Sequence, residues 1–223
     1  MKICVLIPAY NESKNIGHVV RGVRKKHMDV VVVDDGSKDT TGKIAREKGA
    51  VVLVNDPNQG KGRSLKRGFE YVIKCGFDGV LMMDGDGQHD VDDIDQFIDQ
   101  ARQHPVSIVT GNRMVNTVDM PRVRYCTNRF MSWLISTACR QDIPDTQCGY
   151  RYISSHILRQ LHLTSGDFEI ETEILMKASK KGFKIFSVPI KTIYRNEVSQ
   201  IHPVKDTFRF IIYFVKELFS SGN

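Results

Sequence analysis

The most informative segment of this chain is Gly79-Val80-Leu81-Met82-Met83-Asp84-Gly85-Asp86-Gly87-Gln88-His89. Its first half predicts a buried strand, because a short apolar run followed by turn residues is typical of a strand covered on both faces. Asp84 and Asp86 follow the carboxyl end of that strand, where two crowded carboxylates repel each other unless a cation lies between them. Mg²⁺ or Mn²⁺, which prefer oxygen ligands, suit such a pair. The same triplet is also typical of an Asx turn, so the rest of the chain must decide between a metal site and a plain turn.

The segments on both sides of this strand alternate between apolar runs and helical periodicity. Further strands are expected at residues 3–8, 30–33, 51–54 and 106–110, and amphipathic helices at residues 14–26, 40–48, 62–74 and 91–103. This alternation predicts an α/β fold with a Rossmann-like, doubly wound, mostly parallel sheet. Ligands of such sheets bind beyond the carboxyl ends of the strands.

Polar or glycine-rich loops follow the first four predicted strands at those ends. They are residues 8–12 (Pro-Ala-Tyr-Asn-Glu), 34–37 (Asp-Asp-Gly-Ser), 58–62 (Asn-Gln-Gly-Lys-Gly) and the acidic segment at 84–89. Four such loops at one edge of a sheet indicate a single cleft. The glycines of the third loop allow an anion to approach the backbone closely, and Lys61 adds positive charge at the start of a helix.

Several side chains of this cleft are compatible with two roles. One of Asp34 and Asp35 is expected to accept hydrogen bonds from a ribose or a base, and the other to shape a turn. Tyr10 is suited to stacking on a base or to packing, and Glu12 to closing the first helix. His89 is expected to be structural rather than a proton donor.

The second half of the chain is less regular. It predicts a loop and then a helix within residues 120–139, a strand at 148–153, a helix at 169–181, one or two strands within 185–194 and a final helix ending near residue 219. A chain of 223 residues without an evident linker is expected to form one domain, residues 1–223.

Composition and charge narrow the compartment and the partners. The five cysteines are odd in number and form no Cys-x-x-Cys pair, which favours a reduced, cytoplasmic protein without disulfides or zinc. No apolar stretch approaches the roughly 20 residues that a membrane helix needs. The net charge of +6 favours anionic partners. Nucleic acid is not expected among them, because the sequence offers no aromatic and basic platform.

Six motifs follow one another in a fixed order along the chain. They are residues 7–12 (Ile-Pro-Ala-Tyr-Asn-Glu), 33–37 (Val-Asp-Asp-Gly-Ser), 58–62, 84–89, 111–113 (Gly-Asn-Arg) and 145–151 (Asp-Thr-Gln-Cys-Gly-Tyr-Arg), with weaker matches at 188–190 and 194–195. Together they resemble the inverting family 2 glycosyltransferases with the GT-A fold, and most of all the polyprenyl-phosphate sugar synthases of the dolichyl-phosphate mannosyltransferase type. The chain departs from that pattern with Asp-Gly-Asp in place of Asp-Ala-Asp and with Asp90 where a proline often stands.

The resemblance implies a role for each part of the chain. Residues 1–112 would form the nucleotide-sugar-binding half, 113–202 the acceptor half and 203–223 an amphipathic C-terminal helix. The nucleotide sugar would be held by Pro8, Tyr10, Glu12, Asp35, Lys61, Asp84 and Arg195, the metal by Asp84, Asp86 and Gln88, and the acceptor phosphate by Arg113, Arg124 and Asn128, with Asp86 and Arg113 as the catalytic residues.

The implied reaction is the transfer of a hexose, with inversion and with Mg²⁺ or Mn²⁺, from a nucleotide sugar to dolichyl or undecaprenyl phosphate. GDP-mannose is the favoured donor, ahead of UDP-glucose and UDP-N-acetylglucosamine. A lipid phosphate is already largely ionised near neutral pH, so it needs arginines that orient it and no general base. Two alternatives stay open. One is transfer to a sugar hydroxyl, which needs a base such as Asp145 or Glu171, and the other is a non-catalytic nucleotide-binding module.

A lipid acceptor requires contact with a membrane, and two segments are suited to it. They are residues 130–135 (Phe-Met-Ser-Trp-Leu-Ile) and the amphipathic stretch at 204–219. The second would be about 24 Å long as a helix, too short to span a bilayer core of roughly 30 Å. It is suited to lie in the membrane interface, or else to pack on the core or on a second copy. The expected location is therefore peripheral, at the cytoplasmic face of the membrane.

Overall fold

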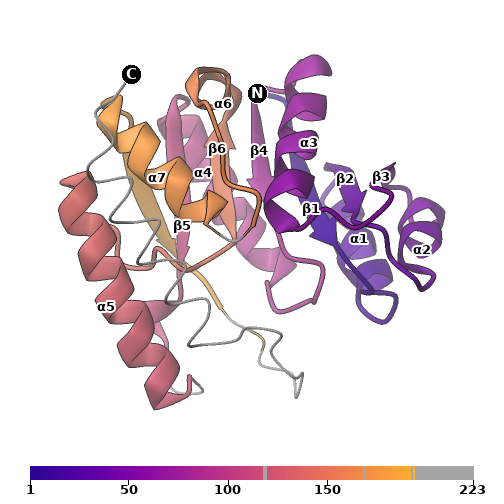
Figure 1. Ribbon diagram of the computed structural model, residues 1–223, viewed down its shortest axis with the longest axis horizontal. Helices are drawn as coiled ribbons and strands as arrows, with labels where there is room; N and C mark the ends of the chain where they lie inside the picture. The colour runs from indigo at the N-terminus through magenta and orange to yellow at the C-terminus, as the bar shows by residue number, and fades with distance from the viewer. Residues whose placement is uncertain (118–119, 168, 192, 194–223) are drawn as a thin grey trace.

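The structure, a computed structural model, describes residues 1–117, 120–167, 169–191 and 193 (Figure 1). Its strands form one sheet in the order β3-β2-β1-β4-β6-β5-β7. The strands are β1 (Ile3–Ala9), β2 (Asp29–Asp34), β3 (Val51–Val54), β4 (Gly79–Met82), β5 (Ser107–Asn112), β6 (Arg151–Ser154) and β7 (Lys184–Pro189). The helices are α1 (Ile16–Lys25), α2 (Thr41–Glu47), α3 (Lys61–Lys74), α4 (Ile94–Gln103), α5 (Arg122–Cys139), α6 (Ser155–Gln160) and α7 (Ile170–Lys180), with short 3₁₀ turns η1 (Val91–Asp93) and η2 (Arg113–Val115).

The directions of the strands confirm the expected mostly parallel sheet. β1 runs parallel to β2 and β4, and β2 runs parallel to β3. β6 lies antiparallel between β4 and β5, and β7 runs parallel to β5. Within the described residues, β6 is therefore the one strand that runs against the others.

Two strand boundaries in the second half differ from the sequence prediction. The strand expected at 148–153 begins at Arg151, because the residues before it follow a turn in which Gln147 N donates to Asp145 Oδ1 at 3.1 Å. The stretch around Pro189 forms one strand, which ends at that proline. Proline has no N–H to continue a ladder, so it suits the end of a strand.

Helices cover both faces of the sheet, as the doubly wound prediction requires (Figure 1). Val30 and Val32 of β2 belong to the core on the side of α1 and α4. Val31 and Val33 belong to the core on the opposite side, with residues of α3 and α7. Successive side chains of a strand point to opposite faces, so a strand covered on both faces is apolar at every position. Burial of each valine side chain stabilises the fold by roughly 1.5–3 kcal/mol. The uninterrupted valine run is therefore easily recognised as a strand in the sequence.

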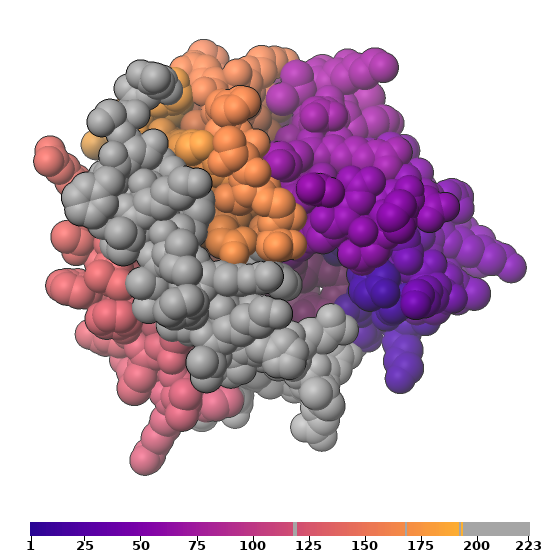
Figure 2. All heavy atoms as spheres, viewed as in Figure 1, coloured from indigo at the N-terminus to yellow at the C-terminus, as the bar shows by residue number. Residues whose placement is uncertain are grey.

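One edge of the sheet collects the loops that the sequence singled out. The carboxyl ends of the parallel strands β1, β2, β3 and β4 meet there, as expected. Because β6 runs in the opposite direction, its amino end lies at the same edge, and residues 145–150 join those loops. In the space-filling view, the orange atoms of the second half abut the magenta atoms of the first (Figure 2).

None of the helices within the described ranges is both long and apolar enough to cross a bilayer. The amphipathic helix expected at residues 203–223, together with Arg195, lies outside the described residues.

Candidate active site

The acidic segment after β4 folds into a tight turn that leaves both carboxylates partly exposed. Gln88 N donates a hydrogen bond to Asp86 Oδ1 at 2.9 Å. Gly87 has a φ of +75°, which glycine adopts without strain. Asp84, Asp86 and Gln88 are each of intermediate exposure. The turn and the ligand interpretations of this segment are therefore compatible, because the turn itself holds the oxygen atoms near the surface.

Lys61 lies between two carboxylates, one from each half of the chain. Its Nζ is 2.8 Å from Asp84 Oδ1 and 2.8 Å from Glu171 Oε1. Burial is the largest single influence and acts to raise the pKa of Asp84, but the attraction and hydrogen bond of Lys61, together with the fields of His89 and Arg113, lower this pKa to about 2. Burial likewise acts to lower the pKa of Lys61, whereas the two carboxylates raise it above its ordinary value. Lys61 and Asp84 are therefore both ionised near neutral pH.

Glycines bring the segment before α7 onto the start of α3. A Cβ atom at Gly62 would lie 2.5 Å from the carbonyl carbon of Gly166. The fully buried carboxylate of Glu173 accepts hydrogen bonds from Thr164 N at 2.8 Å and from Ser165 N at 2.9 Å, which fixes this segment. The contact places Glu171 within reach of Lys61. Sequence reasoning missed this contact, because Gly62 and Gly166 are far apart in the chain and the glycines of the third loop are expected there to admit an anion rather than another backbone segment.

His89 is buried beside Asp84 and is neutral near pH 7. Its ring stacks on Tyr150, with centroids 4.7 Å and planes 17° apart, and its Nδ1 accepts from Asp84 N at 3.1 Å. Burial is the largest cause that lowers its pKa to about 4, although Asp84 acts in the opposite direction. A neutral ring that is 7% exposed is a poor proton donor, in agreement with the structural role expected for His89.

Asp35 shapes the glycine-rich loop before α3. Its carboxylate accepts hydrogen bonds from Asn55 Nδ2 at 2.7 Å, Gln59 N at 3.0 Å and Gly60 N at 2.8 Å. Asp34 accepts from a backbone N–H of the turn that follows it. Both aspartates therefore have a structural role, so the expected division of one structural and one ligand-binding residue is incomplete. A nucleoside would have to use the acceptor capacity that remains on Asp35.

The loop after β1 brings Pro8, Tyr10 and Glu12 to the same edge. Pro8 and Tyr10 are partly exposed. Glu12 closes α1 through its carbonyl oxygen, which accepts from Ile16 N at 2.9 Å. Its own N–H donates to Thr41 Oγ1 at 2.8 Å, which ties this loop to α2.

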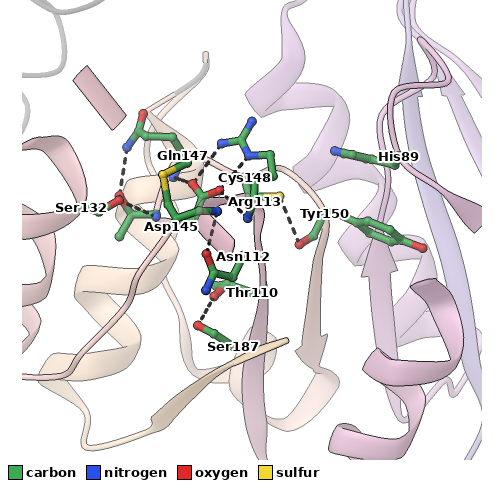
Figure 3. Close-up of polar contacts among 12 residues, drawn as sticks. His89, Thr110, Asn112, Arg113, Ser132, Asp145, Gln147, Cys148, Tyr150 and Ser187 are labelled. Carbon is green, nitrogen blue, oxygen red and sulfur yellow. Dashed lines mark hydrogen bonds and ion pairs between the residues drawn. The ribbon is translucent and has the colours of Figure 1, made fainter. Parts of the chain in front are cut away.

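Arg113 is fixed by a buried ion pair with Asp145 (Figure 3). Its Nε lies 2.7 Å from Asp145 Oδ2 and its Nη2 lies 2.9 Å from Oδ1. Arg113 N at 3.2 Å and Gln147 N at 3.1 Å also donate to this carboxylate, which is fully buried. A carboxylate offers about four acceptor positions, so these four donors occupy them. Asp145 is therefore a poor candidate for the general base of a sugar-hydroxyl transfer.

The buried face of α5 faces the turn that contains Asp145. Ser132 Oγ accepts from Thr146 N at 2.9 Å, and Figure 3 shows Ser132 beside Asp145 and Gln147. Asn128 lies one helical turn before Ser132 on the same face. Asn128 is 8% exposed, and its Nδ2 has no hydrogen-bond partner in the part of the chain that the structure describes. Arg124, one turn earlier again, is partly exposed.

Arg151 ties this turn to α7. It is fully buried, its Nη1 donates to Glu171 O at 2.7 Å, and its Nη2 donates to the carbonyl oxygens of Thr146 and Cys148 at 3.2 and 3.1 Å. The sequence groups Arg151 with the arginines suited to orient an acceptor phosphate, but its complete burial gives it a structural role instead. Its position in an otherwise apolar strand is the signal that could have identified a buried structural arginine.

The donor set of the acidic turn fits a hard divalent cation. The described residues contain no group of three His, Cys, Asp or Glu side chains that could hold a metal ion. Asp84, Asp86 and Gln88 nevertheless offer oxygen atoms only, and Mg²⁺ typically takes one or two carboxylates and completes its shell with water and substrate phosphates. Ile193 N donates to Gln88 O at 3.0 Å, which places Ile193 beside this turn.

Comparison with known sequences identifies relatives over most of the chain. The family profile described as Glycosyl transferase family 2 matches residues 4–161. A UDP-N-acetylglucosamine–dolichyl-phosphate N-acetylglucosaminyltransferase of Methanococcus voltae is 31% identical over 215 residues, covering 86% of this chain and 86% of that protein. An undecaprenyl-phosphate mannosyltransferase of Micrococcus luteus is 28% identical over 210 residues, covering 87% of this chain and 85% of that protein.

Comparison with solved structures identifies the fold. A crystal structure of glucosyl-3-phosphoglycerate synthase from Mycobacterium tuberculosis with UDP has a TM-score of 0.73 at 19% identity, covering 98% of this chain and 79% of that chain. At this identity the likeness concerns the fold alone, which is the GT-A fold. The same enzyme has been crystallised with Mg²⁺ and UDP and with Mn²⁺ and UDP.

Proposed function

Because the chain belongs to glycosyl transferase family 2, we propose that it transfers a hexose, with inversion, from a nucleotide sugar to a polyprenyl phosphate. The chain is a glycosyltransferase, so the alternative of a non-catalytic nucleotide-binding module is set aside. Relatives named for transfer to dolichyl and undecaprenyl phosphate support a lipid phosphate acceptor. We assign residues 1–112 to the donor and residues 113–202 to the acceptor.

The Arg113–Asp145 pair carries this proposal. Asp145 fixes the plane of a guanidinium that is 8% exposed, and a fixed guanidinium is suited to phosphate oxygens. The buried Asn128 Nδ2 without a partner among the described residues is a second donor on the neighbouring helix. An unsatisfied buried donor costs about 1–3 kcal/mol, and a phosphate oxygen would satisfy it. Arg124 is the third member of the proposed acceptor site.

The reaction follows from an acceptor that arrives already ionised. A phosphate oxygen attacks the anomeric carbon from the face opposite the leaving group, so the new carbon–oxygen bond forms as the bond to the nucleotide diphosphate breaks. No proton has to be removed, because the second pKa of a phosphate monoester is about 6. The contribution of Arg113 is orientation of the nucleophile and compensation of its charge. A sugar hydroxyl would instead need a base, and both candidate carboxylates, Asp145 and Glu171, are engaged in ion pairs.

The donor occupies the edge formed by the first half. Pro8, Tyr10, Glu12 and Asp35 are proposed to hold the nucleoside, and Arg195, outside the described residues, the pyrophosphate. Asp84, Asp86 and Gln88 would hold Mg²⁺ or Mn²⁺, which neutralises charge on the leaving diphosphate when it is bound. Lys61 is proposed to act on the donor by holding Asp84 ionised.

The donor is proposed to be GDP-mannose, with UDP-glucose and UDP-N-acetylglucosamine as competitors. Thermal-shift measurements with each nucleotide sugar and Mn²⁺ test the ranking, because a ligand that prefers the folded state raises Tm by mass action. A larger shift with a UDP sugar than with GDP-mannose would reverse it. The protein is proposed to act as a peripheral protein at the cytoplasmic face of the membrane, where its acceptor lies.

Acceptor variants test the reaction itself. Arg113→Met should lower kcat/KM for polyprenyl phosphate roughly 10- to 100-fold, since a hydrogen bond to a charged group contributes about 1.5–3 kcal/mol. Asn128→Leu should raise the acceptor KM without lowering Tm, because it removes a donor that has no partner in the described structure. Arg102→Met, at an exposed position of α4, is the matched control and should leave kcat/KM, the acceptor KM and Tm unchanged. Turnover on a sugar hydroxyl but not on polyprenyl phosphate would refute the proposal.

A further inference from the structure

The outer face of α5 is an exposed apolar ridge. Val123 is 79% exposed, Phe130 55% and Trp133 62%. The rings of Phe130 and Trp133 lie next to each other, with centroids 6.1 Å apart. Cys126 is also exposed and lies between Val123 and Phe130 on the helix surface. We call these four residues the α5 ridge. A contiguous group of large apolar side chains on the surface of a protein usually marks an interaction site.

A row of arginines runs along one side of the α5 ridge. Arg122 and Arg129 are exposed and lie seven residues apart, which places them on one side of α5, and the exposed Arg140 follows directly after the helix. Residues 121–141 contain no aspartate or glutamate, so this charge is not balanced within the segment. The side chain of Arg129 is held in place by Tyr125, whose hydroxyl oxygen accepts a hydrogen bond from Arg129 Nη1 at 3.0 Å. The surface therefore combines aromatic side chains with positive charge that forms no ion pair in the part of the chain that the structure describes.

The opposite face of the same helix belongs to the proposed acceptor site. Asn128 and Ser132 are buried there, and Ser132 is bonded to the turn that holds Asp145. In Figure 1, α5 forms the left flank of the molecule, at the end of the sheet farthest from β3. One helix thus separates the acceptor-phosphate residues from the exposed ridge by no more than its own diameter, about 10 Å.

We propose that the α5 ridge, with its row of arginines, docks the enzyme on an anionic lipid bilayer. The proposal rests on the proposed function, since a polyprenyl phosphate must be taken from a membrane. Aromatic residues favour the bilayer interface, and a basic flank is attracted to anionic headgroups. α5 has 18 residues and is about 27 Å long, enough to lie flat in the interface. The chemistry fits a bilayer better than a protein partner, because the charge is spread along the helix and Arg122 and Arg129 form no ion pair within the described residues.

Trp133 is the one tryptophan of the chain, so its fluorescence reports directly on this surface. Mixing the full-length protein with vesicles of phosphatidylcholine and phosphatidylglycerol should shift the emission to shorter wavelength and protect it from acrylamide. Vesicles of phosphatidylcholine alone should give a smaller effect, and added salt should weaken binding to the anionic vesicles. Co-sedimentation without any change in Trp133 emission would overturn the proposal, because the protein would then bind through another surface.

Variants separate the ridge from general surface hydrophobicity. Phe130→Ser should lower vesicle partitioning several-fold while it leaves Trp133 as the reporter. Arg122→Glu with Arg129→Glu should lower partitioning to anionic vesicles at least 25-fold, from about fivefold for each arginine near the surface. The control is Val51→Ser with Val54→Ser, which removes two exposed valines, 45% and 41% exposed, from the edge strand β3. Equal losses in the control and in the ridge variants would contradict the proposal.

Two readouts distinguish this proposal from the proposed function. Turnover of a short-chain, water-soluble polyprenyl phosphate should be unchanged in the ridge variants, whereas turnover of a long-chain acceptor in vesicles should fall with partitioning. Vesicle binding through the ridge without any transfer to lipid phosphate would leave docking intact and remove the proposed function. Transfer to lipid phosphate that does not depend on the ridge would leave the proposed function intact and refute docking through the ridge. Concentration-dependent association of the protein without vesicles would identify a protein partner on this face and refute the bilayer.

Discussion

Asp145→Asn is expected to destabilise this protein more than a typical buried substitution. The carboxylate is fully buried and accepts four hydrogen bonds, of which three come from Arg113. Asparagine keeps the volume but replaces one oxygen by an NH₂ group. If the NH₂ takes the place of Oδ1, Arg113 Nη2 and Gln147 N face a donor. If it takes the place of Oδ2, Arg113 N and Nε do so.

The magnitude follows from these contacts. Breaking a buried ion pair by removal of one partner costs about 3–5 kcal/mol, because the other charge stays buried without compensation. For a domain of this size, 1 kcal/mol lowers Tm by roughly 2–4 °C, so the expected decrease is about 6–20 °C. Replacing both partners, as in Arg113→Met with Asp145→Leu, should cost less than Asp145→Asn alone, since no unpaired charge remains.

The assay is denaturant unfolding of the single and double variants, together with acceptor kinetics. A positioning role for Asp145 predicts a loss of stability and a raised acceptor KM in the same variant. A general-base role predicts a normal unfolding curve with lost turnover. The reasoning is refuted if Asp145→Asn unfolds within about 1 kcal/mol of the wild type.

Three further predictions concern residues that surround Asp84. Gly149→Ala should lower kcat, because its Cβ would lie 2.9 Å from Asp84 Oδ2, whereas Gly85→Ala should be tolerated, since its nearest neighbours are at 3.5 Å; equal kinetics for the two variants would contradict this. His89→Gln should flatten the pH dependence of stability in the metal-free protein. The His89 pKa falls from 6.5 to about 4 on folding, so the free energy of unfolding of the wild type should decrease by up to about 3 kcal/mol as pH falls from 6.5 to 4. Equal urea midpoints for the wild type and the variant across this pH range would contradict the prediction. Lys61→Met should raise the pKa of Asp84 from about 2 and cost about 3 kcal/mol, measured by unfolding at pH 7, and an unchanged midpoint would show that the ion pair contributes little.

Much of the donor side could be predicted from the sequence. The valine run of β2 and the apolar run of β4 are buried on both faces, so they lack any polar position that would blur the pattern. The acidic turn follows directly in sequence, and its Asx geometry is a local property of Asp86 and Gln88. Local sequence is sufficient there because the decisive contacts join residues that are neighbours along the chain.

The acceptor side could be predicted only in part. The motif resemblance predicts that Arg113 and Asn128 hold the acceptor phosphate, which stays a prediction, and the sequence leaves Asp145 as a possible base. The structure instead pairs Asp145 with Arg113, 32 residues away. Glu171 likewise pairs with Lys61. A carboxylate reads the same in sequence whether it accepts a proton or holds a cation, and only its neighbours in space tell the two apart.

The sequence by itself determined the doubly wound sheet and put the acidic pair Asp84 and Asp86 at the end of a buried strand. It did so because burial on both faces and tight turns leave local patterns. Only the tertiary structure decided that β6 runs antiparallel, which brings residues 145–150 to the same edge as the acidic turn. It alone decided that Lys61 and Arg113 are held by Glu171 and Asp145. Strand direction and long-range ion pairs depend on residues that meet only after folding, and no local pattern encodes them.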